Sequence, residues 1–98
     1  MKESKNIYPK TIGEAVNRIL SKTHDGLKIT IMRSAEEEFA SKFNVGLGAC
    51  IRKDFGLWDN KNPELLRDCT SENIDPDEAS KMILKALWKR VRDKEKKQ

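Results

Sequence analysis

The sequence has few of the residues that metal sites and redox sites require. It contains one histidine, His24, and two cysteines, Cys50 and Cys69, which lie 19 positions apart. A structural zinc site needs four ligands that usually come in close pairs, so this spacing excludes the common zinc motifs. We therefore expect no metal and two reduced thiols rather than a disulfide, with Cys50 as a small residue of the core.

Motifs of known catalytic chemistry are also missing. The chain has no G-x-S-x-G sequence, and its glycine-rich stretch lacks the G-K-[ST] ending of a phosphate-binding loop. His24 precedes Asp25 and Gly26 at the end of a predicted helix, where a histidine commonly serves as a cation near the helix dipole. We expect no enzymatic activity and no cofactor, and no small-molecule substrate is evident.

Long apolar runs are absent as well. No run approaches the roughly 20 residues that a membrane-spanning helix needs, and the first residues lack the pattern of a signal peptide. These absences predict a cytoplasmic protein. The 98 residues, of which 37% are hydrophobic and 37% charged, suffice for one domain with a modest core. We divide the chain into a flexible lead-in (1–10), a helical domain (11–92) and a charged tail (93–98).

Capping patterns and apolar periodicity predict an all-α fold, a compact bundle of four or five short helices with a longer C-terminal helix. Thr11 with Glu14 and Ser34 with Glu37 each form a capping box at the start of a helix. The triple glutamate at 36–38 then lies in solvent at the positive end of its helix. The predicted helices cover residues 12–22, which Asp25-Gly26 terminates, 35–43, 49–55, a short segment opened by Asn62-Pro63, and a long segment opened by Asp75-Pro76.

Residues 27–33 give a conflicting signal. Leu27, Ile29 and Ile31 alternate with other residues at the period of a β-strand. A single strand would have no partner for its backbone groups. The segment is therefore a short helical turn, a strip that covers the core, or an edge strand used in dimerisation, and we favour the covering strip.

The stretch from Gly46 to Trp58, G-L-G-A-C-I-R-K-D-F-G-L-W, holds three of the five glycines and one of the two tryptophans. Glycine is favoured where φ is positive or where other atoms come close. Between the glycines, Ile51 and Phe55 share one helix face, and Leu57-Trp58 follows as an apolar plug. The predicted core consists of Ile12, Val16, Ile19, Leu47, Ile51, Phe55, Trp58, Met82, Ile83 and Leu87.

These residues also carry a resemblance. The pattern G-L-G-x-x-I-R-x-x-x-G-L-W, followed by D-P-D-x-x-S-x-x-I-L from Asp75 to Leu84, resembles a family of small bacterial domains of unknown function. The resemblance covers roughly residues 11–90. It implies a shared fold and no particular reaction.

Two interpretations of Arg52 remain open. In the first, its guanidinium binds backbone carbonyls or a carboxylate such as Asp59 or Asp75. Arg52 then holds the predicted helix at 49–55, the central helix, to the last helix. In the second, Arg52 and Trp58 anchor a protein partner, since Arg and Trp dominate binding hot spots.

The last helix supplies further candidates. Leu84 and Trp88 form an apolar pair rotated away from the main face, which makes this face wider than a small core requires. We therefore favour a small intracellular protein-interaction or regulatory module that binds another protein or a second copy of itself. Its contact residues are predicted to be Arg52, Trp58, Leu84 and Trp88, or the segment 27–31.

The alternative is nucleic-acid binding. Eight basic and only two acidic residues lie in residues 81–98, so the positive charge of the chain is concentrated at this end. Clustered lysine and arginine neutralise phosphates with little further requirement. The candidate residues are Lys85, Lys89, Arg90 and Arg92.

Overall fold

The computed structural model describes residues 8–23, 25–58, 61–69 and 74–96. Within these ranges the structure contains six α-helices, instead of four or five, and no strand, which confirms the predicted all-α class. The helices are α1 (Ile12–Ser21), α2 (Asp25–Arg33), α3 (Glu36–Phe43), α4 (Leu47–Asp54), α5 (Pro63–Cys69) and α6 (Pro76–Lys96). No helix in the described part of the chain is long and apolar enough to cross a membrane.

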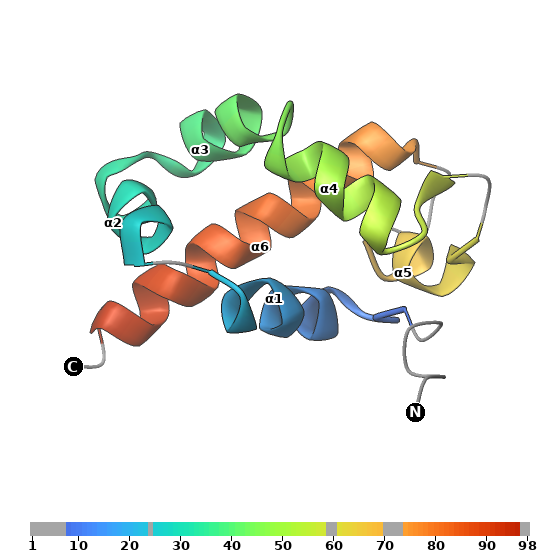
Figure 1. The fold of residues 1–98 in the computed structure, drawn as a ribbon, viewed down its shortest axis with the longest axis horizontal. Helices are drawn as coiled ribbons and strands as arrows, with labels where there is room; N and C mark the ends of the chain where they lie inside the picture. Colours follow the sequence, from blue (N-terminus) through green and yellow to red (C-terminus); the bar gives the residue numbers. More distant parts are fainter. Residues whose placement is uncertain (1–7, 24, 59–60, 70–73, 97–98) are drawn as a thin grey trace.

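The long helix α6 is the centre of the fold. It packs against each of the other five helices. Figure 1 shows α1 along one side of α6 and α3 and α4 along the other, with α2 near its C-terminal end and α5 near its N-terminal end. The glycine-rich stretch at 46–58 is not this centre, because α6 is the element that contacts every other helix. Its buried apolar residues are Ala79, Ile83, Leu84, Leu87 and Val91.

The first helix begins as predicted and ends earlier. The Thr11 hydroxyl accepts a hydrogen bond from the Glu14 backbone N–H at 3.1 Å, which confirms the capping box. Helix α1 ends at Ser21, and Asp25 is already the first residue of α2. The prediction that Asp25-Gly26 terminates the first helix is therefore wrong, since this pair opens the second.

Residues 27–33 are part of α2, not a covering strip or an edge strand. The helix satisfies its own backbone groups, which a lone strand in this position could not do. Only Ile31 of this helix is buried, whereas Ile29 is 54% exposed. The alternation of apolar residues therefore did not reflect a strand with one buried face.

Helix α3 begins one residue later than predicted and uses a different cap. The Ala35 backbone N–H donates to Oε1 of Glu38 at 3.5 Å, while the Ser34 hydroxyl donates to the Thr30 carbonyl of α2 at 2.7 Å. The predicted capping box of Ser34 with Glu37 is thus wrong, because Ser34 follows α2 and bonds to that helix, and α3 starts at Glu36. Phe39 is fully buried on the face that meets α6.

Asn62 joins three segments at the start of α5. Its Oδ1 accepts from the Leu65 backbone N–H at 3.4 Å, as expected of a helix cap. Its Nδ2 donates to the carbonyls of Pro9 at 2.8 Å and Phe55 at 2.9 Å. Pro9 is fully buried, so residues 8–10 belong to the folded domain and not to the lead-in predicted over 1–10, of which residues 1–7 lie outside the described residues.

The core differs from the predicted one chiefly at Trp58. Of the predicted core residues, Val16, Ile19, Ile51, Phe55, Ile83 and Leu87 are buried, and Ile12, Leu47 and Met82 are partly buried against them. Trp58 is exposed. Residues absent from the prediction fill the remaining volume: Ile31, Phe39, Leu57, Leu65, Leu84 and Val91. At the C-terminal end α6 continues to Lys96, beyond the predicted boundary of the charged tail at residue 93, and residues 97–98 lie outside the description.

Candidate protein-binding site

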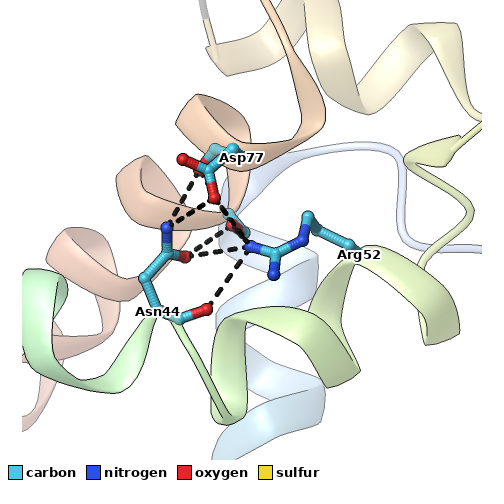
Figure 2. Close-up of polar contacts among 4 residues, drawn as sticks. Asn44, Arg52 and Asp77 are labelled. Carbon is cyan, nitrogen blue, oxygen red and sulfur yellow. Dashed lines mark hydrogen bonds and ion pairs between the residues drawn. The ribbon is translucent and has the colours of Figure 1, made fainter.

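Arg52 on α4 lies at the centre of a polar cluster that connects α4 to α6 (Figure 2). Its Nη1 is within hydrogen-bonding distance of four oxygens: Ser80 Oγ at 2.8 Å, Asp77 Oδ1 at 3.2 Å, and Asn44 Oδ1 and O at 3.3 and 3.4 Å. The two N–H groups of Nη1 are therefore shared among these acceptors. Only 12% of the Arg52 side chain is exposed.

Asn44, just after α3, completes this cluster. Its Nδ2 donates to Asp77 Oδ1 at 3.0 Å, and its Oδ1 accepts from the Ser80 hydroxyl at 2.6 Å. Asn44 and Ser80 are buried, and among the described residues no buried side-chain nitrogen or oxygen lacks a hydrogen-bond partner. The cluster thus joins α4, the end of α3 and the first turns of α6. It supports the first interpretation of Arg52, although the carboxylate is Asp77 rather than Asp75, and Asp59 lies outside the described residues.

Gly48 provides the space that the Arg52 cluster occupies. A β-carbon on Gly48 would overlap Oδ1 of Asn44 and approach Nη1 of Arg52 to 3.2 Å. Because Oδ1 of Asn44 is held by Ser80 and Arg52, it cannot move aside without breaking the cluster. A β-carbon on Gly46, by contrast, would meet nothing within 4 Å. The second glycine of the G-L-G motif is therefore the one that the polar cluster requires.

Gly56 forms the C-terminal cap of α4. Its φ is +69°, its N–H donates to the Lys53 carbonyl at 3.4 Å, and the next N–H, of Leu57, donates to the Arg52 carbonyl at 3.0 Å. This pair of bonds with a left-handed glycine is a Schellman motif. The ring of Tyr8 also lies where a β-carbon would be, with Cε2 at 2.7 Å. Both backbone conformation and space therefore require glycine at position 56.

The two residues after this cap, Leu57 and Trp58, lie in opposite environments. Leu57 is 1% exposed and is part of the core, whereas Trp58 is 51% exposed. The prediction that Trp58 belongs to the core is therefore wrong. The guanidinium carbon of Arg52 lies 6.0 Å from the centroid of the Trp58 ring, at the limit of a cation–π contact. The structure thus brings Arg52 and Trp58 together, with Arg52 mostly buried and Trp58 at the surface.

Comparison with protein families assigns the chain to a family. The model of the family described as Domain of unknown function (DUF6794) matches residues 8–91. The chain belongs to this family. Membership agrees with the predicted resemblance to a family of unknown function, while bacterial origin stays a prediction. No curated protein and no solved structure matched the chain.

The other two predicted contact residues of this DUF6794 domain are a core residue and a residue packed against the core. Leu84 is fully buried, so it is not a surface contact as predicted. Trp88 is partly buried, and its indole N–H donates to the Ser34 carbonyl at 2.8 Å. Arg92 stacks on the Trp88 ring at 4.7 Å and donates to the Met32 carbonyl at 3.0 Å. The wide apolar face of α6 is therefore covered by α2 and the other helices. Trp88 and Arg92 also donate hydrogen bonds to backbone carbonyls at the C-terminal end of α2, which have no acceptor role within that helix.

The four basic residues predicted to bind nucleic acid each have a partner within the DUF6794 domain. Lys85 pairs with Glu37 at 2.8 Å and Lys89 with Glu36 at 3.6 Å. Arg90 donates to Asn17 Oδ1, and Arg92 to the Met32 carbonyl as described. The ion pair lowers the pKa of Glu37 and raises the pKa of Lys85, mainly through their mutual hydrogen bond and charge. The glutamates at the start of α3 therefore offset part of the positive charge of α6.

The two thiols lie in different environments. Both cysteines are free; Cys69 is buried and Cys50 is exposed, so the prediction of Cys50 as a core residue is wrong. Burial, with a smaller effect from the Asp68 charge, raises the pKa of the Cys69 thiol to about 11. His24 lies outside the described residues. In the described ranges, no three His, Cys, Asp or Glu side chains are grouped as a metal site.

Sequence reasoning missed Asn44, Asp77 and Ser80 as partners of Arg52, and Gly48 as the residue that leaves space for them. The signal was present in part, because Gly48 and Ser80 are both fixed positions of the two-part pattern that carries the family resemblance. A glycine, an arginine and a serine in two separated motifs indicate a close contact between the motifs. Nothing in the local sequence distinguishes Asn44 from an ordinary helix-ending residue.

Proposed function

We propose that this DUF6794 domain is a non-catalytic protein-interaction module whose contact is centred on Trp58. The observation that supports it is the half-exposed indole, 51% accessible, directly after a buried Leu57. Large aromatic side chains of this kind dominate the energetics of protein interfaces. Only four large apolar residues are exposed in the described part of the chain, and Trp58 is the one tryptophan among them, which makes it a strong candidate for such a contact.

The backbone beneath Trp58 is held in place before any partner binds. The Schellman motif fixes Gly56 and Leu57, and the Arg52 cluster holds α4 on α6. A side chain on a fixed backbone loses less conformational entropy on binding than one on a mobile loop. The arrangement therefore favours Trp58 as an anchor residue, with Arg52 as its structural support.

The proposed partner is a different protein that offers an apolar pocket for the indole. The exposed large apolar residues of the described chain are Ile29, Met32, Val45 and Trp58. They do not form one face: α2, which carries Ile29 and Met32, lies at the other end of α6 from the segment after α4 (Figure 1). Homodimer interfaces are large and apolar at their centre, so this dispersed distribution favours a small contact with another protein over self-association.

The proposed compartment is the cytoplasm. Two free thiols, one of them at the surface, suit a reducing environment, where disulfides rarely persist. Nucleic-acid binding, the alternative drawn from the sequence, gains no support from Lys85, Lys89, Arg90 and Arg92, because each of them is engaged within the domain.

The proposal is tested by comparing three baits in affinity capture from the native host. The baits are the unmodified domain, Trp58→Ala and Ile29→Ala. Ile29→Ala is the matched control, because it removes a similarly exposed apolar side chain from α2, which lies at the other end of the domain from the segment after α4. We expect at least one protein to be captured by the unmodified domain and by Ile29→Ala and to be lost with Trp58→Ala. Equal capture by all three baits, or light scattering that shows a stable dimer dissociated by Trp58→Ala, would overturn the proposal of a heterologous partner.

A further inference from the structure

A pocket of about 420 Å³ opens between α1, the beginning of α2 and α4, apart from the Trp58 side chain. Its apolar lining consists of Ile19, Leu27, Leu47, Ile51 and Phe55. Ile19, Ile51 and Phe55 are also members of the core, so this part of the pocket wall is firmly packed. Pockets that bind small molecules commonly measure 300–1,000 Å³ and are mostly apolar with a few polar groups. The size and lining of this pocket therefore suit a small ligand rather than a protein segment.

The charged residues of the pocket are unequally divided. Two positive charges come from Arg18 on α1 and from Lys22, the residue that follows α1, four positions later in the sequence. Asp54 on α4 contributes one negative charge. None of the three takes part in an ion pair with another described residue within 4.0 Å. Residues four apart lie on the same side of a helix. The α1 side of the pocket thus carries two neighbouring cations that lack a carboxylate partner among the described residues.

We propose that this pocket binds a small aliphatic monocarboxylate, with its alkyl chain over the apolar lining and its carboxylate against Arg18 and Lys22. The two cations exceed the single carboxylate of Asp54, so an anionic head group is favoured over a cationic one. The apolar wall provides the burial that a hydrocarbon chain needs. This inference does not rest on the proposed function of Trp58, since the pocket and the exposed indole are different surfaces.

The two thiols provide a direct readout of pocket occupancy. Cys50 is exposed and lines the pocket, so a bound ligand would shield it. Cys69 is buried, and because burial raises the pKa of its thiol to about 11, little reactive thiolate forms at neutral pH. The alkylation rate of Cys50 therefore reports on the pocket, and the absence of reaction at Cys69 reports that the domain stays folded.

The probes are octanoate, hexanoate, 1-octanol and octylamine, each titrated against the alkylation of Cys50 by iodoacetamide. We expect octanoate to slow the reaction in a saturable way and to bind more tightly than hexanoate, by roughly fourfold for each added methylene that the lining covers. 1-Octanol and octylamine should bind at least roughly tenfold more weakly, because they lack the charge that Arg18 and Lys22 attract. An unchanged alkylation rate with octanoate, or equal protection by octylamine, would overturn the proposal.

Charge variants separate the proposed head-group site from general adhesion of a fatty chain. The Arg18→Gln/Lys22→Gln double variant should lower octanoate affinity by roughly tenfold. Asp54→Asn should raise it by up to about fivefold, because it removes a like charge near the carboxylate. Lys42→Gln, an exposed cation on α3 that does not line the pocket, is the matched control and should change nothing. The ratio of rates with and without ligand is compared for each protein, since nearby charge also alters thiol reactivity. Equal affinity in the double variant and the control would contradict the assignment.

Discussion

The backbone of Gly48 lies so close to Asn44 that a β-carbon on Gly48 would overlap the Asn44 Oδ1. That oxygen accepts hydrogen bonds from Ser80 on α6 and Arg52 on α4. The absence of a side chain at one position of α4 thus permits the polar cluster that attaches α4 to α6. The polar cluster therefore holds the helix whose C-terminal turn leads directly into the exposed Trp58.

Replacement of Gly48 should therefore destabilise the domain. In Gly48→Ala, the new methyl group would displace Asn44 and leave buried polar groups of the cluster without partners, which costs about 1–3 kcal/mol. The free energy of unfolding from urea titration measures this loss. Gly46→Ala is the matched control, because a β-carbon there meets no atom within 4 Å. Equal stability of the two variants would show that the cluster does not depend on the space at Gly48.

Removal of the Arg52 side chain tests the attachment of α4 to α6. Arg52→Ala leaves Asn44, Ser80 and Asp77 without their shared donor, and we expect a loss of about 2–3 kcal/mol. For a domain of this size, such a loss lowers Tm by roughly 10–20 °C. Lys53→Ala, which removes the exposed neighbouring cation, should change stability by at most about 0.5 kcal/mol. An unchanged Tm for Arg52→Ala would instead favour the interpretation of Arg52 as a partner-binding residue.

Adjacent residues after α4 should differ sharply in their effect on stability. Leu57→Ala removes a fully buried side chain and should cost about 2–4 kcal/mol, through lost burial and the cavity that remains. Trp58→Ala removes a half-exposed side chain and should cost at most about 1 kcal/mol. Thermal unfolding of both variants provides the measurement. A loss for Trp58→Ala as large as that for Leu57→Ala would show that the indole is part of the core.

The ion pair between Glu37 and Lys85 gives stability a defined pH dependence. The pKa of Glu37 is lowered from its usual 4.5, so this pair stabilises the fold above that pH and the contribution is lost as the pH falls through the lower folded value. The pKa of Lys85 is raised above 10.5, so the contribution is fully present below that pH and is lost as the pH rises through the higher folded value. Both charged groups are accessible to solvent, so the effect is small.

Glu37→Gln should therefore lower Tm slightly at pH 7, and the difference from the unmodified domain should shrink toward zero as the pH falls through the lowered folded pKa of Glu37. Thermal unfolding across this pH range makes the comparison. In the Lys85→Gln background, the effect of Glu37→Gln at pH 7 should be reduced, because its main partner is already missing. A difference in Tm that stays constant from pH 7 to the acid limit would contradict the proposed contribution of the ion pair.

Most of the helical framework could be predicted because its signals are local. The Thr11 capping box, the Asn62 cap and the periodicity of the last helix depend on residues within a few positions of one another. The helix at 25–33 was missed because its apolar residues alternate, and only Ile31 is buried against the rest of the domain. A helix that buries one side chain leaves little periodic signal in its sequence.

The candidate site was predictable only in part, because it depends on contacts between distant segments. That Arg52 holds the central helix to the last one could be foreseen, but its partners Asn44, Asp77 and Ser80 come from two other segments. The placement of Trp58 depends on the positive φ of Gly56, which turns Leu57 inward and Trp58 outward. For Leu84 the error was the reverse of that for Trp58: a surface contact was predicted, and the residue is buried. Five helices pack against α6 and leave no surplus apolar face at that position.

The most direct test of the central claim is a titration of the purified protein captured by the domain against the unmodified domain, Trp58→Ala and Ile29→Ala. If Trp58 is the anchor of the interface, Trp58→Ala should weaken binding by at least roughly 30-fold, which corresponds to about 2 kcal/mol, while its Tm stays close to that of the unmodified domain. Ile29→Ala should bind with nearly unchanged affinity. Equal affinities for the unmodified domain and Trp58→Ala would contradict the account.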